Sequence, residues 1–88
     1  MKRSDVEREE MRRQADRIDY ARRRGEMDGR ALAASETAKV NVPSFETLLE
    51  LDGYLTGCYN GYRTELHAFD LTFEDFKPII EARGAMVL

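Results

Sequence analysis

The chain has 88 residues, of which 42% are hydrophobic and 35% charged, and its net charge is −3. This length allows one small domain over residues 1–88 with a thin core, and the hydrophobic content excludes a disordered chain. We find neither an uncharged run of about 20 residues that would span a membrane nor an apolar signal core. The single cysteine, Cys58, excludes an internal disulfide, so we expect a cytoplasmic protein.

The first segment, residues 4–39, has the pattern of a long amphipathic helix. Apolar and small residues share one face at helical spacing: Met11, Ala15, Ile18, Ala21, Gly25, Gly29 and Leu32. Charged residues occupy the other face, where acid-before-base pairs such as Glu9 with Arg13 add about 0.2–0.5 kcal/mol each. The turns before Met11 have little besides Val6 to bury, so we expect them to fray.

Residues 44–69 carry the clearest helical pattern. Pro43 disfavours a helical conformation before it, and Ser44 fits an N-cap. Bulky residues recur at alternating spacings of three and four, which is the spacing of a heptad seam: Phe45, Leu48, Asp52, Leu55, Tyr59, Tyr62, Leu66 and Phe69. Roughly opposite this seam lies a row of glycines one turn apart: Gly53, Gly57 and Gly61.

The glycine row has a counterpart in the first segment, where small residues are also one turn apart: Ala21, Gly25, Gly29 and Ala33. Three glycines inside a helix cost about 3 kcal/mol relative to alanine, and close approach of two helix backbones would offset that loss. In an antiparallel hairpin that turns near Asn41, the facing pairs are Gly29 with Gly53, Gly25 with Gly57, and Ala21 with Gly61. We therefore predict an all-α fold built on a long antiparallel helical hairpin, residues 4–39 and 44–69.

An alternative fold class is α+β, with a β-hairpin around Asn60-Gly61. This dipeptide lies between Tyr59 and Tyr62 and is a strong signal for a two-residue turn. Tyr, Thr and Cys residues nearby also favour strands, and Gly53 would then end a shorter helix. The heptad pattern continues without a break through this region and favours the continuous helix.

The last predicted element is a short helix at residues 73–83. Thr72 and Asp75 fit an N-cap and its acidic partner, and Gly84 fits a C-terminal cap. Pro78 should kink this helix or start it afresh. The helix is only about 16 Å long, so we expect it to cover the C-terminal half of the seam: Tyr59, Tyr62, Leu66 and Phe69.

The N-terminal half of the seam is then left without a partner in the chain. An exposed apolar strip on a small protein usually marks an interaction site, and we expect a second copy or another protein to bind there. The predicted partner-binding residues are Phe45, Leu48, Leu51, Asp52 and Leu55. Asp52 stands where an apolar residue is expected, so we interpret it as a group that sets the register or meets a basic residue.

No motif indicates catalysis, a cofactor or a metal site. His67 and Cys58 are about 13 Å apart along a helix, which is too far for a catalytic pair, and a metal needs more ligands than these two side chains. In style the chain resembles small accessory proteins of phages and mobile elements, which are often inhibitors or adaptors of host factors. Our leading hypothesis is a non-enzymatic, homo-oligomeric protein that binds another protein as an inhibitor or adaptor.

Two other functions remain open from the sequence. Arg22, Arg23 and Arg24 would contact phosphates if the first helix bound nucleic acid as a regulator, although acidic residues interleave with nearly every base. A small anionic ligand would stack on Tyr54, with Arg63 and His67 nearby in the sequence.

Overall fold

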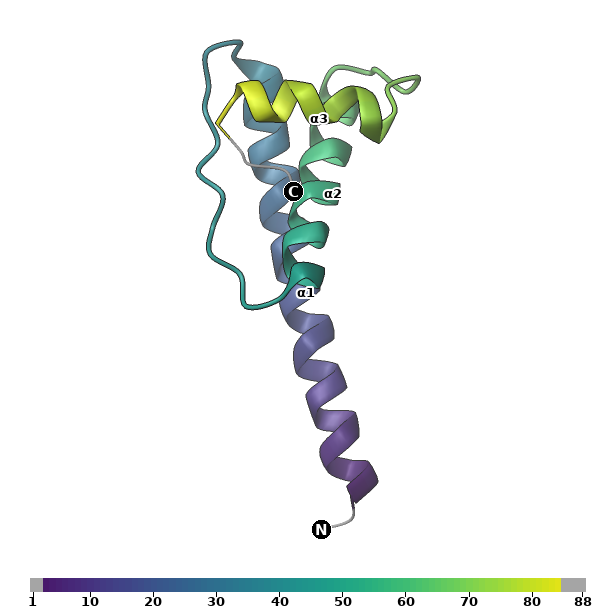
Figure 1. The fold of residues 1–88 in the computed structure, drawn as a ribbon. Helices are drawn as coiled ribbons and strands as arrows, with labels where there is room; N and C mark the ends of the chain where they lie inside the picture. Colours follow the sequence, from purple (N-terminus) through teal and green to yellow (C-terminus); the bar gives the residue numbers. More distant parts are fainter. Residues whose placement is uncertain (1–2, 85–88) are drawn as a thin grey trace.

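A computed structural model of the chain describes residues 3–84, and their side chains from Val6 onward. The described residues form three helices and no strand: α1 (Arg3–Ala34), α2 (Leu48–Glu65) and α3 (Phe73–Ala82) (Figure 1). The prediction of an all-α fold is confirmed. The β-hairpin alternative is wrong, because Asn60 and Gly61 lie inside α2 and Gly61 serves helix packing instead of a turn.

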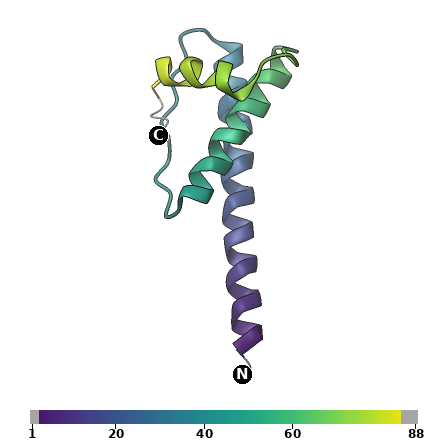
Figure 2. The ribbon, with the colours of Figure 1, turned by 45° about the vertical axis from the view of Figure 1, so that its right-hand side comes forward.

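The helices α1 and α2 pack closely, but they run in the same direction (Figures 1 and 2). Along α2, Gly53 lies against Ile18. One and two turns further on, Gly57 lies against Arg22 and Gly61 against Glu26. Because the residue numbers rise together along both helices, the pair is parallel.

The two glycine rows therefore face each other as predicted. The prediction that the two helices are antiparallel is wrong. Gly29 lies against Cys58 and not against Gly53, and Gly61 lies against Glu26 and not against Ala21. Both rows have a period of four residues, so they match in either direction and cannot by themselves distinguish the two arrangements.

The connection between α1 and α2 explains the direction. α1 ends at Ala34 and α2 begins at Leu48, which leaves residues 35–47 between them. An extended chain of this length spans up to about 45 Å, whereas α2 is only about 27 Å long. The chain returns along the helix pair before α2 begins (Figure 1). The N-cap of α2 is Thr47, whose Oγ1 accepts a hydrogen bond from the Glu50 amide at 3.2 Å, and not Ser44 as predicted.

Close contact between the backbones of α1 and α2 leaves no room for side chains at four positions: Gly25, Gly29, Gly57 and Gly61. A Cβ at any of them would collide with a main-chain carbonyl oxygen of the facing helix. At Gly57 it would also lie 2.9 Å from the carbonyl carbon of Arg22 and 3.0 Å from the Glu26 nitrogen. The α-hydrogens in these places point at carbonyl oxygens, which is the geometry of the weak Cα–H···O contacts seen between closely packed helices.

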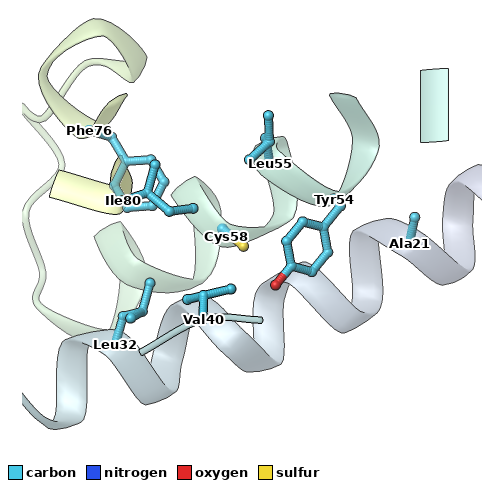
Figure 3. Close-up of a cluster of buried hydrophobic side chains, with 8 residues drawn as sticks. All are labelled: Ala21, Leu32, Val40, Tyr54, Leu55, Cys58, Phe76 and Ile80. Atoms are coloured by element: carbon cyan, nitrogen blue, oxygen red, sulfur yellow. The ribbon is translucent and has the colours of Figure 1, made fainter. Parts of the chain in front are cut away.

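The helix α3 crosses the end of the pair formed by α1 and α2 (Figure 1) and completes the core. The core side chains come from all three helices and from the connection (Figure 3): Ala21, Leu32, Val40, Tyr54, Leu55, Cys58, Phe76 and Ile80. Thr72 and Asp75 form the predicted capping box at the start of α3. The helix continues through Pro78, and Gly84 follows it with a positive φ of 105°.

α3 covers only part of the seam that we expected it to cover. The Tyr62 and Phe76 rings lie 5.3 Å apart, and Tyr59 packs edge-on against Phe73 at 5.6 Å. Leu66 and Phe69 remain exposed. They follow the end of α2 at Glu65, in a turn where His67 adopts a left-handed conformation with φ 54°, so they no longer continue the helical seam.

Arg83 fastens the end of α3 to the end of α1. Its guanidinium donates hydrogen bonds to the carbonyls of Leu32 at 3.0 Å, Ala38 at 2.7 Å, and Ser35. Its own carbonyl accepts a hydrogen bond from the Val40 amide at 2.9 Å. The last carbonyls of a helix have no partner within it, and Arg83 satisfies one of them, that of Leu32. Its bonds to Ser35 and Ala38 hold the start of the connection in place.

The N-terminal part of α1 extends alone beyond α2 (Figures 1 and 2). The ion pair between Arg17 and Glu50 marks the level at which α2 begins. We call residues 3–16 the α1 extension. Because of it the molecule is elongated, measuring 52 × 23 × 19 Å.

Candidate interaction surface

The predicted partner-binding residues lie near the start of α2, with different degrees of exposure. Leu48 is 74% exposed and Asp52 is also exposed. Phe45 and Leu51 are half-buried, and the Phe45 ring packs 5.6 Å from the Tyr54 ring. Leu55 is buried in the core. All five residues border one surface, because Leu55, although it belongs to the core, also lines a hollow there with Leu48 and Asp52.

An apolar groove of about 550 Å³ runs between the connection and the first turn of α2. Its apolar lining residues are Val40, Val42, Pro43, Phe45, Leu48 and Leu51. Leu48 and Leu51 also line a second hollow of about 350 Å³, together with Leu49, Asp52 and Leu55. Leu49 is 56% exposed. We call Leu48, Leu49, Leu51 and Asp52, with the groove beside them, the leucine surface.

Sequence reasoning missed Leu49, because this residue lies off the heptad seam. The signal that would have found it is the Leu48-Leu49 pair directly after an N-cap, where α2 has no preceding turn to cover both side chains. With the helices parallel, the start of α2 lies near the point where the N-terminal part of α1 continues alone, and among the described residues the connection lies next to it (Figure 1).

Glu50 fixes the first turn of α2, and the sequence reading did not single it out. Its side chain is buried, and its Oε1 lies 3.1 Å from the Arg17 Nε. A buried carboxylate is costly unless it is paired, and its place near the helix N-terminus is favourable. The pair with Arg17 therefore holds the leucine surface at a defined position along α1.

The predicted nucleic-acid-binding residues are exposed on α1, with acidic side chains among them. Arg22 and Arg23 both pair with the Asp19 carboxylate, at 2.9 and 3.0 Å. Arg24 lines a groove of about 410 Å³ that also includes Tyr20, and together with Arg23 it lines a hollow of about 560 Å³ that also includes Asp28. Three consecutive helical residues are 100° apart, and a shared acidic partner reduces the field that two of them present to phosphates. Nucleic-acid binding stays a prediction.

The residues proposed for a small anionic ligand are not brought together. Tyr54 is fully buried in the core. Arg63 lies over the Tyr59 ring, 5.1 Å from its centroid, and donates a hydrogen bond to its hydroxyl at 3.1 Å. His67 lies in the turn after α2, beside Phe69.

Tyr54 and Cys58 face α1 side by side in the core (Figure 3). The Tyr54 hydroxyl donates a hydrogen bond to the Asp28 carboxylate at 2.5 Å. Burial is the main cause that raises the pKa of Tyr54 above its usual value, and burial also raises the pKa of the Cys58 thiol to about 12. A thiol that stays protonated is a poor nucleophile, and both side chains are fully buried in the core beside α1.

Among the side chains that the structure describes, no group of three or more His, Cys, Asp or Glu residues is placed to hold a metal ion. Within residues 3–84, no helix combines the length and the apolar character needed to cross a membrane. Comparison of the chain with protein families, curated proteins and solved structures finds no significant match.

Proposed function

We propose that this protein is a non-enzymatic binding module that docks an apolar segment of another protein on the leucine surface. The observation that carries the proposal is the pair Leu48 and Leu49, 74% and 56% exposed beside a groove of about 550 Å³. Burying one leucine side chain contributes roughly 1.5–3 kcal/mol. Single exposed leucines are ordinary, but a contiguous apolar patch usually marks an interaction site.

The charge around the leucine surface supports a partner segment with basic residues beside its apolar side chains. Asp52 lies at one hollow and Glu46 at the groove, and both side chains are exposed. Residues 31–88 contain nine acidic and four basic residues, so the wider field is negative. Acidic groups at the rim of an apolar interface favour association with basic partners and select against acidic ones.

Binding through the leucine surface would allow the protein to function as an inhibitor or as an adaptor. A protein of 88 residues that covers an apolar segment of its partner inhibits that partner if the segment is functional. It acts as an adaptor if its remaining surfaces bind a further protein.

The test replaces Leu48 and Leu49 with glutamate in one variant, because both side chains are exposed and their replacement should leave the fold intact. Leu66→Glu is the control, since Leu66 is an exposed leucine in the turn after α2. The wild type and both variants serve as bait in a nuclease-treated native lysate, with mass spectrometry as the readout. We expect the same protein to be retained by the wild type and by Leu66→Glu and lost by the double variant. Equal capture by all three would contradict the proposal.

A further inference from the structure

The groove of the leucine surface reaches the point where the described part of the chain ends. Gly84 is the last described residue, and it lines this groove together with Leu48 and Leu51. The Val40 amide donates a hydrogen bond to the Arg83 carbonyl at 2.9 Å, so the end of α3 is fastened to the connection that forms one wall of the groove (Figure 1). The residues that follow Gly84 therefore start at the groove itself.

The next four residues, which we call the apolar segment, are Ala85, Met86, Val87 and Leu88. They carry no charge, although 35% of the residues in the chain are charged. The groove beside them is lined mainly by apolar side chains, among which Phe45 and Leu51 are only half-buried. Moving apolar side chains from water onto such a lining is favourable and requires no particular geometry. The composition of the apolar segment therefore matches the chemistry of the groove at which it starts.

We propose that the apolar segment folds back into the groove of the leucine surface and occupies it in competition with a partner. Four extended residues reach up to about 13 Å, so the segment covers the part of the groove that adjoins Gly84. A segment attached beside its site binds intramolecularly, at an effective concentration of about millimolar for a short flexible connection. No separate molecule is needed to cover the groove.

The backbone at Gly84 allows the chain to leave the direction of α3 at this point. α3 ends at Ala82, and Gly84 follows with a positive φ of 105°. This left-handed conformation is typical of the residue that ends a helix, and glycine adopts it without a steric cost. A Cβ at Gly84 would lie 3.2 Å from the Val40 carbonyl oxygen, so the backbone here passes close to the connection.

The energetics predict that the apolar segment is held reversibly. Burial of its three larger side chains favours docking, whereas fixing the backbone of four residues opposes it by a comparable amount. Occupancy of the groove raises the apparent dissociation constant of a competing ligand by the inverse of the free fraction. A groove that is free about a quarter of the time thus binds that ligand about fourfold more weakly.

This competition regulates the leucine surface, and in that respect the inference rests on the proposed function. Leu48 and Leu51 line both the groove and the hollow next to Leu49, so the apolar segment and a partner compete for the same side chains. Docking of the segment itself requires no partner, and neither of the experiments below uses one. Their failure would leave the proposed function standing, whereas equal partner capture by the Leu48 and Leu49 double variant would overturn that function alone.

Cross-linking within one chain tests where the apolar segment lies. Val87→Cys is combined with Leu48→Cys in one protein and with Lys39→Cys in a second. Lys39 is the matched control, because it is exposed, its Cδ lies 4.0 Å from the place of a Gly84 Cβ, and it lies outside the groove lining. The native Cys58 is buried. Oxidised glutathione accepts the two electrons and two protons of the thiols and becomes two molecules of reduced glutathione as the disulfide forms.

The ratio of the two cross-linking rates separates a docked segment from a freely moving one. A freely moving segment would reach position 39, beside Gly84, at least as readily as position 48. We expect the disulfide to position 48 to form at least about threefold faster, measured by mass spectrometry of the monomer at micromolar concentration. Equal rates, or faster linkage to position 39, would overturn the proposal.

Binding of the uncharged dye Nile red tests whether the apolar segment competes for the groove. Met86→Glu with Leu88→Glu should release the groove, so the dissociation constant of the dye should fall at least about threefold. Leu66→Glu with Phe69→Glu adds the same charge at exposed residues after α2 and should leave the constant unchanged. Adding Leu48→Glu to the segment variant should abolish its gain. An unchanged constant in the segment variant, or a gain that persists with Leu48→Glu, would contradict the proposal.

Discussion

The helix α1 contains two regions that differ in the size and charge of the side chains on their contact face. From Ala21 to Gly29 its contact face is nearly bare, and the α2 backbone lies directly against it. In the α1 extension the same face carries Met11 and Ala15, and neither α2 nor α3 covers it (Figure 2). Small residues allow close contact between the two backbones, whereas the bulkier and strongly charged turns of the α1 extension make no such contact with α2 or α3. The comparison predicts large effects of substitution in the first region and small effects in the second.

Replacement of Gly57 should have the largest effect on stability. A Cβ there collides with the main chain of Arg22, and backbone cannot move aside as a side chain can. We expect Gly57→Leu to abolish folding, and Gly57→Ala to destabilise by about 1–3 kcal/mol in spite of the helix propensity that alanine adds. Thermal unfolding followed by circular dichroism measures both.

Gly53→Ala is the matched control for the glycine contact. A Cβ at Gly53 would lie 3.2 Å from the Ile18 side chain and from its carbonyl oxygen, which small shifts can relieve. We expect this variant to stay within about 1 kcal/mol of the wild type. If Gly53→Ala and Gly57→Ala were equally stable, the backbone contact would not be the main constraint on this interface.

Loss of Arg83 should have the next largest effect. Arg83→Ala removes three hydrogen bonds to main-chain carbonyls, of which one is the Leu32 carbonyl in the last turn of α1 and two belong to the connection. Hydrogen bonds of charged groups contribute about 1.5–3 kcal/mol each, although they are not additive, so we expect a loss of about 2–4 kcal/mol in urea unfolding. Arg83→Lys should recover only part of it, and full recovery would contradict the role of the planar guanidinium.

Alkaline pH should weaken the contact between α1 and α2 and leave the α1 extension unaffected. The folded state raises the pKa of Cys58 to about 12 from a usual value of 9.0, so between these values the unfolded state loses a proton that the folded state keeps. Stability is therefore fully present below about pH 9 and falls as the pH rises, by up to about 1.4 kcal/mol per unit. Melting temperatures between pH 7 and 11 should show this fall, and Cys58→Ala should show a shallower one. Identical slopes would argue against a contribution from the thiol.

The smallest effect is expected in the α1 extension. Met11→Ala removes an exposed side chain and introduces a better helix former, so the free energy of unfolding should change by no more than about 0.5 kcal/mol. The measurement is made at low protein concentration, where self-association does not contribute. A loss comparable to that of Gly57→Ala would show that Met11 belongs to a core within the chain.

Local chemistry made several parts of the fold predictable. These parts depend on residues close in sequence or on a simple period. They are the capping box at Thr72, the turn after α3 at Gly84, and the packing of the two glycine rows against each other. The direction of α2 was not predictable from the rows, because it depends on where α1 ends. Ser35 to Ala38 continue the helical pattern in sequence, but Arg83, far along the chain, binds their carbonyls in a non-helical path.

The candidate surface was predictable in position and less so in detail. The short helix α3 is not long enough to cover the whole heptad seam, and this difference in length correctly indicated an exposed region near Leu48. Leu55 lies in the core, because at its level along the seam the side chains of all three helices pack together. Leu49 became exposed because α2 begins at the end of the helix pair, a consequence of the parallel arrangement.

The central claim is that α1 and α2 are parallel with glycines in contact, and distances between spin labels test it most directly. Labels on cysteines at Asp16 and Leu49, and in a second sample at Arg30 and Leu49, occupy exposed sites, while Cys58 is buried and unreactive. In the parallel pair the start of α2 lies beside Arg17, and Arg30 lies about 20 Å further along α1 by the helical rise. Because the lateral separation of the two helices enters both distances, the 16–49 distance should be shorter than the 30–49 distance by at least about 10 Å. The opposite order, with position 49 close to position 30, would contradict the parallel arrangement.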